Sequence, residues 1–156
     1  MLYIYIYIYI YIYIVFILVG HVCVCVTSCA GRLCTLLIRR GARIDPRDSL
    51  LSETPLHKAV RANAIDNVSA LLAFTKSRSN HLRAVDIAGN TALHKAAALP
   101  GTDLAVWNML LAADGAAAAA KMTNSDGANV LQIAQRAKNS VAQAVLRTFD
   151  AQISSY

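Results

Sequence analysis

Charge is missing from the start of this chain, and cysteine is missing from Thr35 onward. Residues 1–31 contain no Lys, Arg, Asp or Glu, so the net charge of +6 belongs to the remaining residues. The four cysteines all lie in or beside the uncharged segment: Cys23, Cys25, Cys29 and Cys34. Their spacing, C-x-C-x3-C-x4-C, is not a usual zinc pattern. We therefore expect no metal site, no cofactor and no disulfide-stabilised secreted domain.

The sequence also lacks the short motifs of several common enzyme classes. It contains no G-x-x-x-x-G-K-[ST] phosphate loop, no G-x-G-x-x-G dinucleotide fingerprint and no H-E-x-x-H zinc site. No Ser or Cys nucleophile with an acidic partner recurs beside His57 and His94. The sequence therefore predicts a protein that is not an enzyme.

Residues 1–31 are a low-complexity hydrophobic leader. Tyr3 to Ile14 is an unbroken Tyr-Ile alternation, and Val22 to Val26 alternates Val with Cys. A strand of this composition would aggregate in water. The run at 2–19 is near the minimum length for a membrane-spanning helix, and it lacks the basic start of a secretory signal. The interpretation we rank first is genetic, because TAT-ATA and GTG-TGT dinucleotide repeats encode Tyr-Ile and Val-Cys, so that the leader is a misannotated translation.

A hexapeptide recurs in the rest of the chain. Residues 54–59 read T-P-L-H-K-A, residues 91–96 read T-A-L-H-K-A, and residues 129–134 form a decayed copy, N-V-L-Q-I-A. Thr91 lies 37 residues after Thr54, and Asn129 lies 38 residues after Thr91. Repetition at this spacing indicates a stack of small helical units.

Each copy has the features of a helix start. The Thr54 side chain can accept from the free amides of a first turn, and Pro55 is tolerated at the first helical position. Leu56, Ala59 and Val60 then form a narrow apolar stripe. A second apolar set follows: Val68, Leu71 and Leu72. Each unit is therefore predicted to be two short antiparallel helices joined by a tight turn.

The hexapeptide closely matches the T-P-L-H-x-A signature of ankyrin repeats, and the chain from Leu33 onward resembles that family. Residues 36–45 are similar to the tail of a preceding repeat. The resemblance implies an all-α solenoid of about three and a half helix-turn-helix units, with residues 32–156 as the ankyrin domain. The usual period is about 33 residues. We interpret the excess, at 74–83, 99–103 and 116–121, as insertions outside the helix cores.

The resemblance implies a structural role for the motif residues. The threonines and proline begin helices, the histidines hydrogen-bond within and between units, and the glycine permits a turn with positive φ. These residues are Thr54, Pro55, His57, Thr91, His94 and Gly89.

The resemblance also implies a non-catalytic protein–protein interaction scaffold that binds its partner on a concave face. The positions it assigns to that face are Lys58, Arg61, Lys95, Arg136, Arg47, Asp48, Glu53, Ile87 and Asn90. Two further helix positions, Ala98 and Ile133, are neutral, and the four charged helix positions are all basic. These four are expected to form one stripe of like charge, which favours an acidic or phosphorylated protein partner. An equally supported interpretation is that these cations are ordinary solvated residues. Nucleic acid is not expected, because no aromatic residues are interleaved with the cations.

We expect a cytoplasmic, monomeric adaptor, and two alternatives stay open. If residues 2–19 insert into a membrane, the arginines that follow favour a single-pass protein with a cytosolic ankyrin domain. The second alternative is a truncated or mispredicted gene product without independent function. Mapping the transcript across the leader discriminates between these hypotheses.

Overall fold

The computed structural model describes residues 31–75 and 81–153. The predictions for the leader, including a membrane span at 2–19 and the roles of Cys23, Cys25 and Cys29, lie outside the described residues. Among the helices that are described, none has the length and apolar composition needed to cross a membrane.

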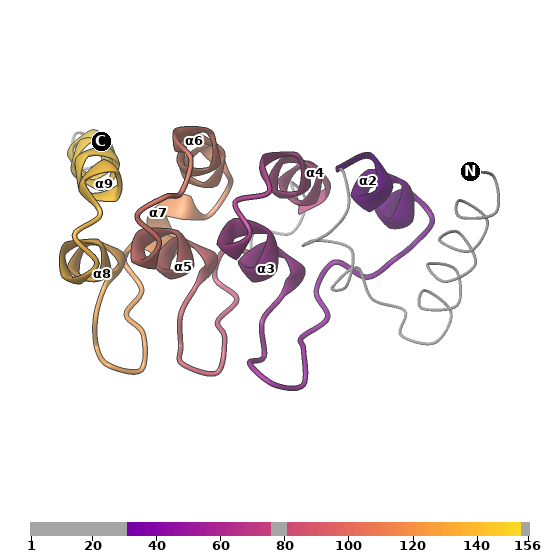
Figure 1. The fold of residues 1–156 in the computed structure, drawn as a ribbon, viewed down its shortest axis with the longest axis horizontal. Coiled ribbons are helices and arrows are strands. Elements are labelled where there is room, and N and C mark those ends of the chain that lie inside the picture. Colours follow the sequence, from indigo (N-terminus) through magenta and orange to yellow (C-terminus); the bar gives the residue numbers. More distant parts are fainter. Residues whose placement is uncertain (1–30, 76–80, 154–156) are drawn as a thin grey trace.

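The described residues form eight helices and no strand. The helices are α2 (Gly31–Arg39), α3 (Pro55–Arg61), α4 (Ile65–Thr75), α5 (Ala92–Ala98), α6 (Leu104–Ala112), α7 (Ala116–Ala120), α8 (Val130–Arg136) and α9 (Ser140–Ile153). Figure 1 shows two rows, one of α3, α5 and α8 and the other of α2, α4, α6 and α9, with long turns projecting below the first row. The predicted all-α solenoid is confirmed.

The helices pack as a linear series of units. Within units, α3 packs against α4 and α8 against α9, and between units the contacts run along each row, from α3 to α5 to α8 and from α4 to α6 to α9. Helix α2 packs on α4 as the second helix of a preceding unit. It ends before Gly41, which has a φ of 90°.

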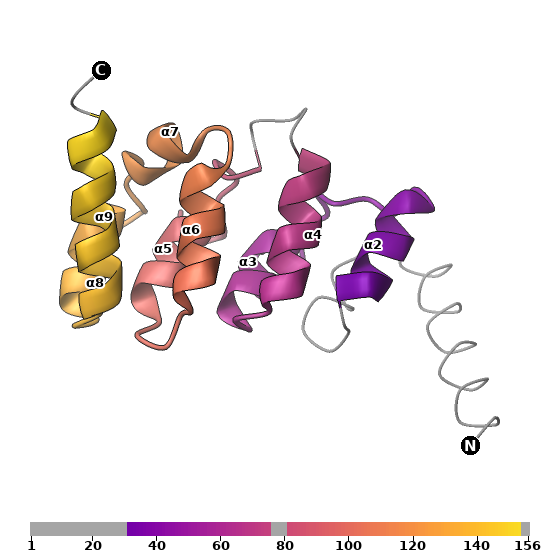
Figure 2. The same cartoon turned by 90° about the horizontal axis from the view of Figure 1, so that it is seen from above.

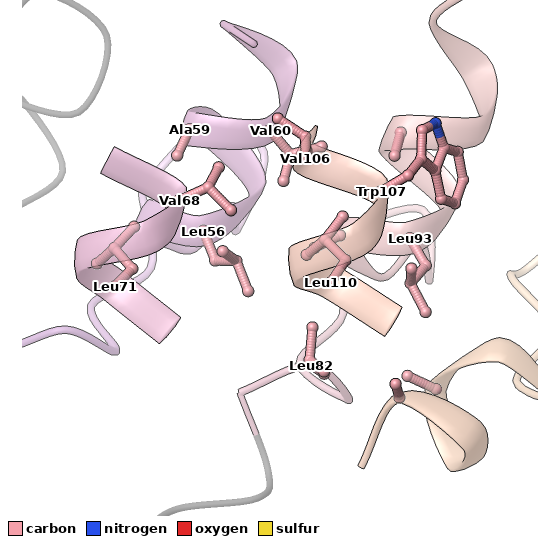
Figure 3. Packing of buried hydrophobic residues seen from close by; sticks show 14 of the residues in the cluster. Leu56, Ala59, Val60, Val68, Leu71, Leu82, Leu93, Val106, Trp107 and Leu110 are labelled. Atoms are coloured by element: carbon pink, nitrogen blue, oxygen red, sulfur yellow. The ribbon is translucent and has the colours of Figure 1, made fainter. Parts of the chain in front are cut away.

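The core is a continuous strip between the two rows. Ala59, Ala96 and Ala134 occupy equivalent positions in the first helices and are fully buried, which lets neighbouring helices approach closely. Larger side chains fill the remaining space, each stabilising the fold by about 1.5–3 kcal/mol on burial. Figure 3 shows this cluster around α3, α4, α5 and α6, with Trp107 and Leu110 among its largest members.

Part of the extra sequence belongs to the core, contrary to our interpretation of it as insertions outside the helix cores. Residues 116–120 form α7, which packs against α6 (Figure 2) and buries Ala116 and Ala119. Leu82, from the segment between α4 and α5, is 2% exposed. Alanine favours a helix and is small enough to fill a gap beside one, so a run of alanines can extend the packed interior.

Candidate functional site

The two motif histidines close the first turn of their helices. The Thr54 backbone amide donates to Nδ1 of His57 at 3.2 Å, and Thr54 Oγ1 lies 2.8 Å from the same nitrogen. Thr91 and His94 repeat this arrangement at the same distances. Because the backbone amide must donate, Nδ1 is the acceptor and the proton is on Nε2. Each histidine thus satisfies an amide that a helix start would otherwise leave unpaired.

The other ring nitrogen of each histidine joins its unit to the next. Nε2 of His57 donates to the Asn90 carbonyl oxygen at 2.9 Å, and Nε2 of His94 donates to the Ala128 carbonyl oxygen at 3.2 Å. Burial lowers the pKa of both histidines and outweighs the accepting carbonyls, which act in the opposite direction. The neutral ring with its proton on Nε2 is the form that makes both sets of bonds.

The decayed third copy keeps the capping geometry with different side chains. The Asn129 amide donates to Oε1 of Gln132 at 2.9 Å, and the Gln132 amide donates to Oδ1 of Asn129 at 2.8 Å. A hydroxyl and imidazole pair is thus replaced by two side-chain amides. The hexapeptide signature alone makes this copy look weak, whereas its hydrogen bonds are complete.

Each long turn is organised by one acceptor side chain, and these acceptors are Asp48, Asp86 and Asn124. Oδ1 of Asp86 accepts from the amides of Ala88 and Asn90 at 2.9 and 2.8 Å. Oδ1 of Asp48 accepts from Leu51 at 2.7 Å, and Oδ1 of Asn124 accepts from Ala128 at 2.9 Å. The three acceptors are 38 residues apart. Sequence reasoning placed Asp48 in the site but missed that Asp86 and Asn124 are its equivalents, which the 38-residue spacing could have revealed.

Backbone hydrogen bonds join the tips of neighbouring turns. The Ile87 amide donates to the Leu51 carbonyl at 2.9 Å, and the Ser125 amide donates to the Ala88 carbonyl at 3.0 Å. Oδ1 of Asn90 also accepts from Nδ2 of Asn124 at 3.1 Å. The tips therefore form one row in fixed register. Because each tip is bonded to the next, residues far apart in sequence are held side by side.

The expected stripe of like charge does not form. Lys58 Nζ lies 2.8 Å from Asp48 Oδ2, and Lys95 Nζ lies 2.7 Å from Asp86 Oδ2, so successive units contain the same ion pair. The Glu53 side chain is fully buried and forms two ion pairs. Its Oε1 lies 3.1 Å from Lys95 Nζ, and its Oε2 lies 3.3 Å from Arg61 Nη1. Three of the four predicted cations are therefore balanced by turn carboxylates.

The titration of these groups reflects the ion pairs. The hydrogen bond with Lys58 lowers the pKa of Asp48 to about 2. Burial acts to raise the pKa of Asp86, but Lys95 and the turn amides outweigh it and lower that pKa. Burial acts to lower the pKa of Lys95, and the two neighbouring carboxylates raise it instead. Both members of the Lys95 and Asp86 pair are therefore charged at neutral pH.

The fold, the caps and the joined turns agree with one family. The family model for ankyrin repeats in three copies matches residues 21–119, which is more than half of the chain. The chain belongs to the ankyrin repeat family. The match ends before α8, although α8 and the turn before it repeat the capping box and the turn geometry of the matched units. A search of curated proteins found none that matches the chain.

The other residues that the resemblance assigned to the binding face do not form one cluster. Arg136 is exposed on α8 and forms no ion pair with any described residue. Ile87 is 69% exposed at a turn tip. The Arg47 guanidinium donates to the carbonyls of Val85 and Ser52 and so joins two turns.

Two structural motif residues have the positions that the resemblance implied. Pro55 is buried at the first position of α3, and Gly89 has a φ of 74°. No cluster of three metal-ligating side chains occurs within 31–75 and 81–153.

Proposed function

We propose that this ankyrin protein is a non-catalytic adaptor that binds a protein partner with its inner face. We define the inner face as the row α3, α5 and α8 together with the turn tips. Ankyrin repeats are generally protein–protein interaction modules, and the family match supports this assignment. The observation that carries the proposal is the register of the row, in which histidines and tip amides bond each unit to the next. Such a rigid row can present side chains from several units to one partner.

Fewer cations are available to an acidic partner than the sequence suggested. Lys58, Arg61 and Lys95 already contact carboxylates, so an acidic partner would have to displace them. An acidic or phosphorylated group therefore finds its best support at Arg136, which among the four cations predicted for the inner face is the one without such a contact in the described structure.

Capture of a partner with matched variants tests this proposal. The full chain is used to recover a cross-linked partner, which is identified and then measured in purified form. Ala98 and Arg136 are exposed on the inner face, so Ala98→Glu with Arg136→Glu should weaken binding by about tenfold or more. Ser69 and Arg147 are exposed on α4 and α9 in the other row. Ser69→Glu with Arg147→Glu should leave binding unchanged, and the opposite pattern would place the site on the second row.

The proposal includes a monomeric protein in the cytoplasm, and its alternative is a single-pass membrane protein with a cytosolic ankyrin domain. The two hypotheses differ in the role of residues 2–19, which are outside the described residues. Alkaline extraction of membranes from cells that express the full chain separates them. A cytoplasmic adaptor should be released into the supernatant, and retention in the pellet would support the membrane-tethered form.

A further inference from the structure

The first two turn tips expose large apolar side chains. Leu50 is 84% exposed, Ile87 is 69% exposed and Leu51 is 41% exposed. The bond from the Ile87 amide to the Leu51 carbonyl places the two tips that carry these side chains next to each other. Turns usually carry small or polar residues, as the third tip does with Ser125 and Asp126. The two apolar tips therefore form one patch, which we call the tip patch.

Charges along the row distinguish one kind of partner from another. In the two units that carry the tip patch, Lys58 and Lys95 form ion pairs with turn carboxylates. These two lysines therefore do not favour a charged ligand. The third tip differs, because Asp126 is exposed and forms no ion pair with any residue in the described ranges. Asp126 is the equivalent of Ala88, and it follows Ser125, whose amide joins its tip to the second. The charge complementary to Asp126 at this tip is positive.

The geometry sets the spacing of the two contacts. Neighbouring helices in such a stack are about 8–10 Å apart, and an extended chain rises about 3.3 Å per residue. We propose that the turn tips bind an extended protein segment whose apolar side chain packs on the tip patch and whose Lys or Arg, about three residues away, pairs with Asp126. This inference rests on the proposed function and specifies the partner's chemistry.

Selection from a random peptide library displayed on phage, with the full chain as bait, tests the inference. The selected peptides should share an apolar residue with a Lys or Arg about three positions away. Leu50→Ser with Ile87→Ser should weaken their binding by about tenfold, because both side chains would lose apolar contact area. Asp126→Lys should instead select Asp or Glu at the charged position. Asp114→Lys, at another exposed acid, should leave the selected sequence unchanged.

Three results would overturn the inference. In the first, peptides bind the tip variants as tightly as the wild type but fail to bind the variant with Ala98→Glu and Arg136→Glu. That result would place binding on the helices, and the proposed function would stand without the tip patch. A wild-type dimer dispersed by Leu50→Ser and Ile87→Ser in sedimentation would assign the patch to a second copy of the chain. A selection that yields no shared sequence would contradict a peptide-binding row, while partner capture still tests the proposed function. Far-UV circular dichroism verifies that each variant stays helical.

Discussion

At the scale of single residues, each motif histidine uses both ring nitrogens at once. Nδ1 of His94 accepts from Thr91 at its own helix start, and Nε2 donates to the Ala128 carbonyl of the next turn. The third copy shows which part of this role is replaceable, because Gln132 accepts from Asn129 without an imidazole. Capping therefore needs an acceptor at this position, whereas the link between units needs a second, donating nitrogen.

Replacing His94 tests this division of roles. His94→Ala leaves the buried Thr91 amide without an acceptor and removes one of the two donors to the Ala128 carbonyl, which the Asn124 amide still contacts. This should cost about 1–3 kcal/mol and lower the melting temperature by a few degrees. His94→Gln should lose less, because its amide oxygen can accept as that of Gln132 does. Thermal denaturation followed by circular dichroism measures both, and the same comparison applies to His57. Equal losses for the Gln and Ala variants would contradict the capping role.

The lowered pKa of both histidines predicts that acid destabilises the protein. Between the folded and unfolded pKa values the unfolded state binds more protons, so the contribution to stability is fully present above about pH 6.5 and is lost as the pH falls below it. The free energy of unfolding from urea titrations should therefore fall from pH 7.5 to pH 5. Asp48 does not contribute in this window, because its folded pKa is about 2 and its ordinary value is 3.8.

The control for this pH dependence is the double variant His57→Gln with His94→Gln. It removes both titrating rings while leaving an acceptor at each cap. Its stability should change less with pH than that of the wild type. A pH slope that is the same in both proteins would show that other groups cause the loss.

At the scale of elements, the turns differ in how closely they approach one another. Gly89 and Gly127 have nearly equal φ values of 74° and 71°. A Cβ atom added at Gly89 would lie 2.7 Å from the Ser125 amide nitrogen, whereas one added at Gly127 would meet nothing within 4 Å. The equivalent position in the first turn is Ser52, which adopts a φ of 55° with a side chain. Glycine is thus needed at the second tip for space as well as for conformation.

Alanine substitution at the two glycines separates these requirements. Gly127→Ala should cost about 1–2 kcal/mol, the penalty of a left-handed conformation for a residue with a Cβ atom. Gly89→Ala should cost clearly more, because the third turn must also move away. Trp107 is fully buried and is the chain's single tryptophan, so its fluorescence reports urea unfolding of both variants. Similar losses would indicate that the close approach is relieved without strain.

At the scale of the whole molecule, ion pairs add to the coupling between units. Lys95 of the second unit contacts Glu53 in the turn of the first, and the same cation contacts Asp86 in its own turn. Since each unit of a solenoid contacts mainly its neighbours, stability depends on such interfaces. The side chains of Glu53 and Asp86 are almost completely buried, so losing their shared cation is costly.

Removing this cation should destabilise the array more than removing an unpaired one. Lys95→Met is expected to lower the free energy of unfolding by about 2–4 kcal/mol, because it leaves two buried carboxylates with fewer compensating contacts. Arg136→Met, at an exposed cation without an ion pair in the described structure, should change it by no more than about 0.5 kcal/mol. Urea titrations at neutral pH measure both. A loss at Lys95 as small as that at Arg136 would show that the network contributes little.

The sequence by itself determined where the first helices begin and which family they belong to. Thr54, Pro55 and His57 act within one helical turn, so their spacing is the same in the sequence and in the folded chain. The apolar stripe of α3 is equally local. These features predicted the repeating unit and the buried alanines.

Only the tertiary structure decided which of those positions face one another. Glu53 meets Lys95 from 42 residues away, and Leu51 meets Ile87 across two turns. It also decided that Ala116 joins the core. The prediction of a basic stripe considered the cations without their partners. The carboxylates that pair with them come from turns that fold back onto the helices. Charge balance and surface contact depend on distances across units, which the stacking of the units sets and the spacing within one repeat does not contain.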